Sequence, residues 1–269
     1  MSPFGLNGIL AQFNPLAPIA SEPLFTFSLW RWSVTVSNHM FMIALAAAVL
    51  IIAVPMAVRR RKGVPGGFHS LIEAVCVFLR DEVARPILGS HADRYIGFIW
   101  TVFFFILTLN LLAMVPTEKF VTLVTGKKSH WGGAATANIW VTGAMAAVSF
   151  FMIHISGIRE QGLRNYIVHF IPPVPWWMMP FIYFLELISA FVRPFALAIR
   201  LFANILAGHI LLATIMGLIV LFKSFSVACV SLAVVVAMSF MELFVAFLQA
   251  YIFTFLTVLF ISFSVAPEH

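Results

Sequence analysis

Charged residues are scarce in this sequence. Asp, Glu, Lys and Arg make up only 10% of its 269 residues, and 62% are hydrophobic. Soluble domains carry roughly 25% charged residues, so this composition, with a mean hydropathy of +1.03, excludes an ordinary soluble domain. We therefore expect an all-α, polytopic membrane protein.

Cysteine is nearly absent, and no secretory signal is evident. Cys76 and Cys229 lie in separate apolar contexts without metal-ligand spacing, so both are interpreted as small apolar residues. We expect no metal site and no cofactor. The net charge of +6 comes from basic residues clustered between hydrophobic runs, where they set membrane orientation. Nucleic acid is therefore not an expected partner.

Hydrophobic runs predict about five membrane helices in a single membrane domain over residues 38–269. The first span, 38–58, is followed at once by Arg59, Arg60, Arg61 and Lys62. This positive-inside signal places that end on the cytoplasmic or matrix side and the N-terminal segment 1–37 on the outer side. Further spans are predicted at 94–115 and 134–155.

Residues 68–88 show a different periodicity. Their apolar residues recur every three or four positions, which predicts a helix with one apolar face. The opposite face carries His69, Glu73, Arg80, Asp81 and Arg85. The pattern indicates an amphipathic helix lying on the membrane surface, and a helix packed against another subunit would show the same pattern.

Two long apolar segments, 180–222 and 225–265, are separated only by Lys223 and Ser224. A helix of forty residues is about 60 Å long, whereas the hydrocarbon core is about 30 Å thick. Each segment must therefore be steeply tilted or broken. Together, 180–265 predict a slanted hairpin able to follow a neighbouring object in the membrane, with the C-terminus on the cytoplasmic or matrix side.

The first long segment contains polar residues despite its apolar character. An arginine at the centre of a membrane helix costs about 2.5–3.5 kcal/mol on insertion scales, so a functional role is the default interpretation. At about 100° per residue, one stripe of the helix carries Glu186, Ser189, Arg193, Arg200 and Asn204.

Polar residues also lie beyond this stripe. His209 faces the opposite side, and Glu242 and Gln249 share a face of the second long segment. Positions equidistant from the turn at residue 224 should meet, which pairs Arg200 with Gln249 and His209 with Glu242.

Structural interpretations of these residues remain open. Asn204 can simply bond a neighbouring helix, and Glu186 with Arg193 can form an interfacial ion pair. For Arg200 the structural alternative is a salt bridge within the chain. Few deep carboxylates are available for it, which suggests a carboxylate partner on another chain.

Two motifs carry a resemblance to a known family. The sequence RPFALAIRLFANILAGHILL, followed later by MELFVAFLQAYIFTFLTVLF, closely resembles subunit a of the F-type ATP synthase, and the resemblance extends from the first span to the C-terminus. In that family, subunit a is the membrane stator beside the rotating c-ring and provides two proton half-channels. The nucleotide site lies elsewhere in the complex.

The resemblance implies roles for the polar residues. Arg200 would be the essential cation facing the rotor carboxylates, with Asn204 and Gln249 as its polar neighbours. His209 and Glu242 would form the acid–base pair of the outer half-channel. The inner half-channel would contain Glu186, with Ser189 and Arg193 on the same stripe.

The resemblance also implies partners and a location. The partners would be the c-ring, the peripheral-stalk b subunits, membrane lipid and protons. The chain would lie in an energy-coupling membrane, for which the bacterial inner membrane is favoured and the mitochondrial inner membrane is the alternative.

One motif departs from the family pattern. In TANIWVT, Asn138 stands where many relatives carry Asp. If Asn138 lines the outer half-channel, it can hydrogen-bond water but cannot carry a proton. The loop 117–133 has no part in the motifs.

Two other classes compete with this interpretation. A secondary transporter predicts inverted repeats with matching broken helices, which we do not find. A membrane subunit of a redox complex predicts paired histidines as haem ligands. The deep histidines, His154 and His209, do not form such a pair.

Overall fold

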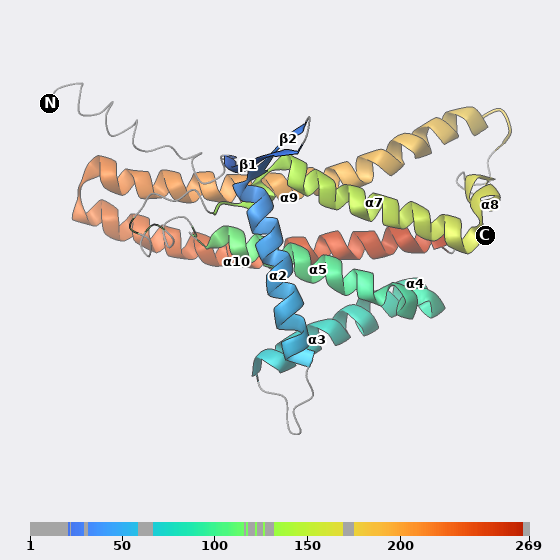
Figure 1. Cartoon of the computed structure of the whole chain (residues 1–269), viewed down its shortest axis with the longest axis horizontal. Coiled ribbons are helices and arrows are strands. Elements are labelled where there is room, and N and C mark those ends of the chain that lie inside the picture. Colours follow the sequence, from blue (N-terminus) through green and yellow to red (C-terminus); the bar gives the residue numbers. More distant parts are fainter. Residues whose placement is uncertain are drawn as a thin grey trace. The chain divides into compact units, whose positions relative to one another are not determined.

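The computed structural model describes residues 21, 23–29, 32–58, 67–115, 117, 122, 126, 132–168 and 175–265. The described residues are almost entirely helical and include five helices long and apolar enough to cross a membrane (Figure 1). This confirms the predicted all-α, polytopic class. Trp30, the basic run 59–62 and the charged residues of the 117–133 loop lie outside the described residues.

The chain forms two compact units. Unit 1 comprises residues 1–46, 107–141 and 201–248, and unit 2 comprises 47–106, 142–200 and 249–269. The division into an N-terminal segment and one membrane domain stays a prediction.

Two of the shorter spans lie close to their predicted bounds, and a third is displaced. Helix α2 is Asn38–Val58, and α5 is Ala92–Met114. Helix α7, Ile139–Gln161, begins and ends several residues later than the predicted 134–155. The cause of the late start is local: Ala135–Ala137 forms a 3-10 turn, which is tighter than an α-helix.

A β-hairpin precedes the first span and was not predicted. Strand β1, Pro23–Leu29, pairs antiparallel with β2, Trp32–Ser37. Apolar residues alternate with polar ones in both strands, and alternation of this kind is the ordinary sequence signal for a strand. The hairpin is a small exception in a helical chain.

The predicted amphipathic helix, 68–88, is helical in three consecutive pieces. These are α3, Gly67–Phe78, the π-helical turn η2, Leu79–Ala84, and α4, Arg85–Leu88. Gly89, with a φ of 55°, then ends α4. A side chain would strain this backbone conformation. The one-turn helix η3, Gly89–His91, leads into α5.

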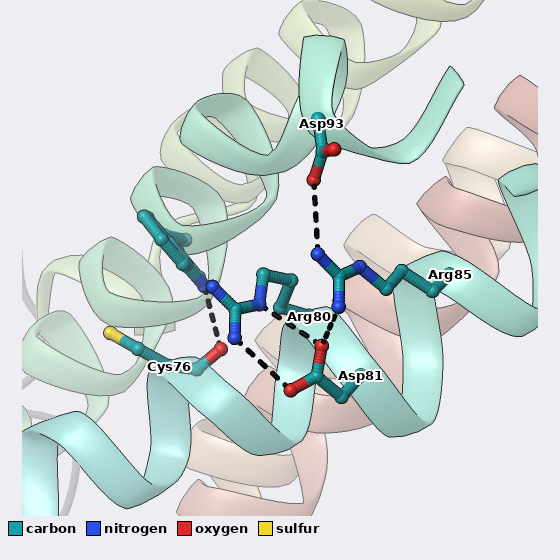
Figure 2. A network of polar contacts seen from close by, with 6 residues as sticks. Cys76, Arg80, Asp81, Arg85 and Asp93 are labelled. Carbon is teal, nitrogen blue, oxygen red and sulfur yellow. Dashed lines mark hydrogen bonds and ion pairs between the residues drawn. The ribbon is translucent and has the colours of Figure 1, made fainter. Parts of the chain in front are cut away.

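A chain of ion pairs connects these pieces (Figure 2). The Asp81 carboxylate accepts hydrogen bonds from Arg80, at 3.0 Å, and from Arg85, at 2.8 Å. Arg85 also lies 3.7 Å from Asp93, beyond the Gly89 bend. The Trp100 indole N–H of α5 donates to the Cys76 carbonyl of α3 at 3.0 Å. The polar face expected from the sequence is thus a set of paired charges.

The last two helices are α9, Met179–Phe222, and α10, Phe225–Val265. They are joined by the predicted two-residue turn, in which Lys223 adopts a φ of 46° (Figure 1). Both helices are unbroken, although α9 contains Pro194. Helices of 44 and 41 residues are about 60 Å long, so they fit within a bilayer core only when steeply tilted.

Hydrogen bonds to main-chain carbonyls connect α10 to its neighbours within each unit. In unit 1 the Asn110 amide of α5 donates to the Ala246 carbonyl at 3.3 Å. In unit 2 the Ser262 hydroxyl donates to the Ile87 carbonyl at 2.8 Å. These polar contacts anchor a helix that is otherwise apolar, where packing alone discriminates poorly between protein and lipid.

Candidate functional site

Arg200 lies on the long helix α9 with its side chain exposed. It makes no hydrogen bond or ion pair with any described residue, in contrast to Arg193, which lies about two turns earlier on the same helix. A cation on a helix this apolar is costly unless it meets water or an opposite charge. Arg200 therefore has no counter-charge in the part of the chain that the structure describes.

Two amides were predicted to accompany Arg200. Asn204 follows it by one turn of α9, and the Nδ2 atom of Asn204 is buried without a hydrogen-bond partner. Gln249, on α10, is only 3% exposed, and its Nε2 atom is likewise unpartnered. The structure shows no hydrogen bond between Arg200 and Gln249, so their pairing stays a prediction.

Glu242 and Gly208 lie against each other in unit 1. A Cβ atom built on Gly208 would stand 2.6 Å from the Glu242 Oε1 atom, a distance that real Cβ atoms do not tolerate. Residues 208 and 242 thus face each other across the hairpin, whereas the count from the turn predicts a pairing of the next residue, His209, with Glu242. The absence of a side chain at Gly208 makes room for the carboxylate.

Both members of the predicted acid–base pair are poorly satisfied. Glu242 is 6% exposed, and its Oε1 atom is buried without a partner, as is the Nε2 atom of His209. Buried polar atoms normally have a hydrogen-bond partner. Both atoms are therefore available for protons or water, and the structure shows no hydrogen bond between them, so the pairing of His209 with Glu242 stays a prediction.

Glu186 and Arg193 form an ion pair in unit 2. Arg193 donates to the Glu186 carboxylate at 3.2 Å, and its guanidinium lies 5.1 Å from the centre of the Phe260 ring, in cation–π geometry. Ser189 is half-buried between them on α9. The pair lines a small cavity of about 110 Å³, which is large enough for several water molecules.

Asn138 has a structural task. Its Oδ1 atom accepts the Trp140 N–H at 2.9 Å, and its own backbone is extended. An asparagine in this position is an N-cap, which satisfies one of the free N–H groups at the start of α7. An aspartate would accept the same bond.

The cavity beside Glu186 and Arg193 is also lined by residues for which the sequence predicts no role. The His154 Nδ1 atom lies 2.5 Å from the Tyr166 hydroxyl, and Gln161 donates to the Ser264 carbonyl at 2.6 Å. His154 was considered only as a haem ligand. Its signal in the sequence is a titratable group inside an apolar span, but its partner belongs to a separate short helix, α8, Leu163–Val168.

Metal ligation finds no support in the described part of the chain, where no group of three His, Cys, Asp or Glu side chains could hold an ion. The deep polar groups instead comprise one unpaired cation, carboxylates, a histidine and amides on tilted membrane helices. This set defines a class: a polytopic membrane protein that handles charge or protons within the bilayer.

The comparisons with known proteins identify the family within that class. Residues 40–262 match the family model described as "ATP synthase A chain". A protein of Myxococcus xanthus (strain DK1622) named ATP synthase subunit a is 40% identical over 239 residues, which cover 87% of this chain and 74% of that protein. The ATP synthase subunit a of Chloroherpeton thalassium (strain ATCC 35110 / GB-78) is 36% identical over 245 residues, which cover 88% of this chain and 68% of that protein.

A third relative is considerably longer. The ATP synthase subunit a of Anaeromyxobacter sp. (strain Fw109-5) is 38% identical over 239 residues, and the match spans about half of it, 55%.

The chain belongs to the ATP synthase A chain family. The function predicted from the two late motifs is thereby confirmed: this is a membrane stator subunit of the subunit a type from an F-type ATP synthase, involved in proton transport and working within a larger membrane complex. The transporter and redox alternatives are set aside by the same finding. The individual site residues remain predictions.

Gly208→Ala tests whether the close approach of Glu242 matters. The added methyl must displace the carboxylate by about 1 Å, and a misplacement of that size can cost about a hundredfold in rate. We expect ATP-driven proton pumping by vesicles containing the assembled complex to fall by about tenfold or more. Gly143→Ala is the matched control, since nothing lies within 4 Å of a Cβ there. Equal pumping by both variants would show that Glu242 has no required position.

Asn138→Ala tests the helix cap. Loss of an N-cap hydrogen bond costs about 1 kcal/mol. In the purified complex, this subunit should therefore unfold at a lower temperature than in the parent. Asn138→Asp retains the bond and should match the parent. If the Ala and Asp variants unfold at the same temperature, the N-cap hydrogen bond does not stabilise α7.

Proposed function

We propose that this chain forms two proton half-channels against a ring of c subunits and that Arg200 faces the carboxylates of that ring. The observation that carries the proposal is Arg200 itself: an exposed, unpaired cation on an apolar helix. Glu186 is occupied by Arg193, and Glu242 is buried against Gly208. The missing carboxylate is therefore supplied by another chain.

The fixed charge of Arg200 sets the order of events. An arginine guanidinium stays protonated in proteins, so it does not relay protons. It favours the ionised form of each carboxylate that passes it, and that carboxylate must first give its proton to the inner half-channel. Once past, it takes a new proton from the outer half-channel. Each elementary charge that crosses yields about 2.3 kcal/mol per 100 mV.

The two half-channels use different residues. The outer one contains His209 and Glu242, which lie in unit 1, and the inner one contains Glu186, Ser189 and Arg193, which lie in unit 2. Histidine exchanges protons near neutral pH, which suits loading. Supporting this division, the outer pair has unpartnered buried atoms, whereas the inner carboxylate is held by a cation.

Around Arg200, the amides of Asn204 and Gln249 act as polar neighbours. Their unpartnered nitrogens can donate to a carboxylate or to water near the arginine. Asn138 caps α7 and contributes an uncharged hydrogen-bonding group to the outer side, without carrying a proton.

The partners and the membrane follow from the same proposal. The tilted hairpin lies along the c-ring, peripheral-stalk b subunits hold the stator, and nucleic acid has no part. The relatives named above are bacterial, which supports the bacterial inner membrane as the location. The C-terminus then lies on the cytoplasmic side.

Arg200→Ala is the decisive variant. Assembly of the complex should be intact, because Arg200 makes no hydrogen bond or ion pair with a described residue of its own chain, whereas proton-driven ATP synthesis should fall to background. The measurement is the rate of ATP synthesis in vesicles energised by a proton gradient, together with the amount of this subunit in the complex. Arg159→Ala, an exposed arginine at the end of α7, is the control and should retain synthesis. Synthesis by Arg200→Ala would refute the assignment.

His209→Ala combined with Glu242→Ala tests the outer half-channel. Positioned proton-transfer groups contribute about 10²–10⁴-fold, so loading from the outer side should slow by at least tenfold. The rate of synthesis is measured while the pH of one side is varied and that of the other is held. We expect the dependence on outer pH to change and the dependence on inner pH to persist. Equal changes on both sides would contradict the division.

A further inference from the structure

We infer that His154 and Tyr166 form a proton-transfer station at the inner half-channel, a pair that the family motifs do not include. The inference rests on the proposed function, since it needs a proton path on this side. It is carried by a contact, a cavity and an alignment of helix ends, all within unit 2.

The contact joins a titratable ring to a hydroxyl. The His154 Nδ1 atom and the Tyr166 Oη atom are 2.5 Å apart, which is within hydrogen-bonding distance. The other ring nitrogen, Nε2, has no hydrogen bond with a described residue and is not among the buried unpartnered atoms. It is therefore left to water. The Phe150 ring packs edge-on against the imidazole with ring centres 4.1 Å apart, which fixes its orientation.

The cavity brings this pair to the proposed inner half-channel. Its walls include His154 from α7, Tyr166 from α8, Glu186 and Arg193 from α9, and Ser264 from α10. These are the titratable and charged groups that face the histidine, with Gln161 as a further polar neighbour. A volume of about 110 Å³ admits several waters, so water can connect the imidazole to the Glu186 carboxylate.

Chain direction places the cavity at one membrane boundary. His154 lies seven residues before the end of α7, Glu186 lies seven residues after the start of α9, and Ser264 is at the end of α10. Seven residues of helix span about 10 Å. The chain leaves α7, forms α8 and enters α9 on the same side of the bilayer, so the station lies within about 10 Å, measured along the helices, of the helix ends on that side.

Gly157 shows that the close approach of Tyr166 is built into the fold. A Cβ atom on Gly157 would stand 2.8 Å from the Tyr166 Cδ2 atom and 2.9 Å from the Ser264 carbonyl oxygen, and the ring's Cε2 atom would be closer still. The tyrosine can reach His154 only because residue 157 has no side chain. Packing of an apolar ring alone would not explain why a tyrosine, with its hydroxyl group, stands at residue 166.

The transfer is balanced in protons. Water in the cavity delivers one proton to the His154 Nε2 atom, and the proton on Nδ1 moves to the Tyr166 oxygen. The original hydroxyl proton of Tyr166 leaves through the Ser264 side chain, with which Tyr166 is hydrogen-bonded, and Ser264 passes its own proton to water on the inner side. One proton enters and one leaves. Burial foremost raises the pKa of Tyr166, the hydrogen bond with Ser264 lowers it, and the charge of Glu186 raises it further. The net shift is upward, so the phenol stays protonated and acts as a relay without ionising.

Tyr166→Phe and His154→Gln test the station. The first keeps the ring without its hydroxyl, and the second keeps a hydrogen-bonding side chain that does not titrate. The whole complex is reconstituted in vesicles, and the rate of ATP synthesis is followed while the inner pH is varied across about pH 5 to 8, where histidine changes charge. We expect each variant to lower the rate by about tenfold and to flatten the dependence on inner pH, with the dependence on outer pH unchanged.

Controls separate transfer from packing. Tyr251→Phe is the matched change, because Tyr251 makes ring contacts with Phe78 and Phe255 and should behave as the parent. Gly157→Ala, which displaces the Tyr166 ring, should reproduce the Tyr166→Phe profile. In a background with Cys76→Ala and Cys229→Ala, His154→Cys should be blocked by silver ions added on the inner side, because water reaches this position.

The outcomes distinguish a failure of the proposed function from a failure of the His154–Tyr166 station alone. Synthesis by Arg200→Ala would overturn the proposed function itself. If Arg200→Ala is inactive while His154→Gln and Tyr166→Phe keep the parent's rate and inner-pH profile, only the station is refuted. A uniform loss of rate with an unchanged profile would assign the pair a packing role and would also refute the station.

Discussion

The structure depends on one electrostatic constraint: an arginine on an apolar helix that has no counter-charge among the described residues of its own chain. A cation at the centre of a membrane helix costs about 2.5–3.5 kcal/mol on insertion scales, and no described residue forms an ion pair with Arg200 to offset it. The described carboxylates on the same hairpin are placed elsewhere, one paired with Arg193 and one against Gly208. This arrangement supports the proposal that a carboxylate of another chain faces Arg200.

The length of the hairpin follows from the same constraint. An upright helix of about twenty residues would offer a rotor one narrow line of contact. Helices of 44 and 41 residues must tilt, and a tilted helix presents positions at several depths along a curved neighbour. Glu186 and Arg200 lie on one stripe of α9, whereas His209 faces the opposite side. The unbroken course of α9 through Pro194 preserves this separation of the two faces.

Much of the fold was predictable because a long run of apolar residues is sufficient to identify a membrane span. The two-residue turn at Lys223 and Ser224 and the bounds of α2 match the prediction. The late start of α7 was missed, because the apolar residues 134–137 conceal a 3-10 turn and the capping role of Asn138. The β-hairpin was overlooked although its strands alternate in polarity. The Tyr166 contact to His154 could not be predicted, since it depends on where a short helix folds back and on the missing side chain of Gly157.

The two carboxylates of the hairpin have different environments. Glu186 lies within hydrogen-bonding distance of the Arg193 guanidinium and lines a cavity large enough for water. Glu242 is buried against Gly208, and its Oε1 atom has no hydrogen-bond partner among the described residues. Buried polar atoms normally have such a partner, so Glu242 still needs a hydrogen-bonding group from water or from another chain, whereas Glu186 already has its counter-charge. This difference in environment supports the proposal that the two carboxylates belong to separate half-channels.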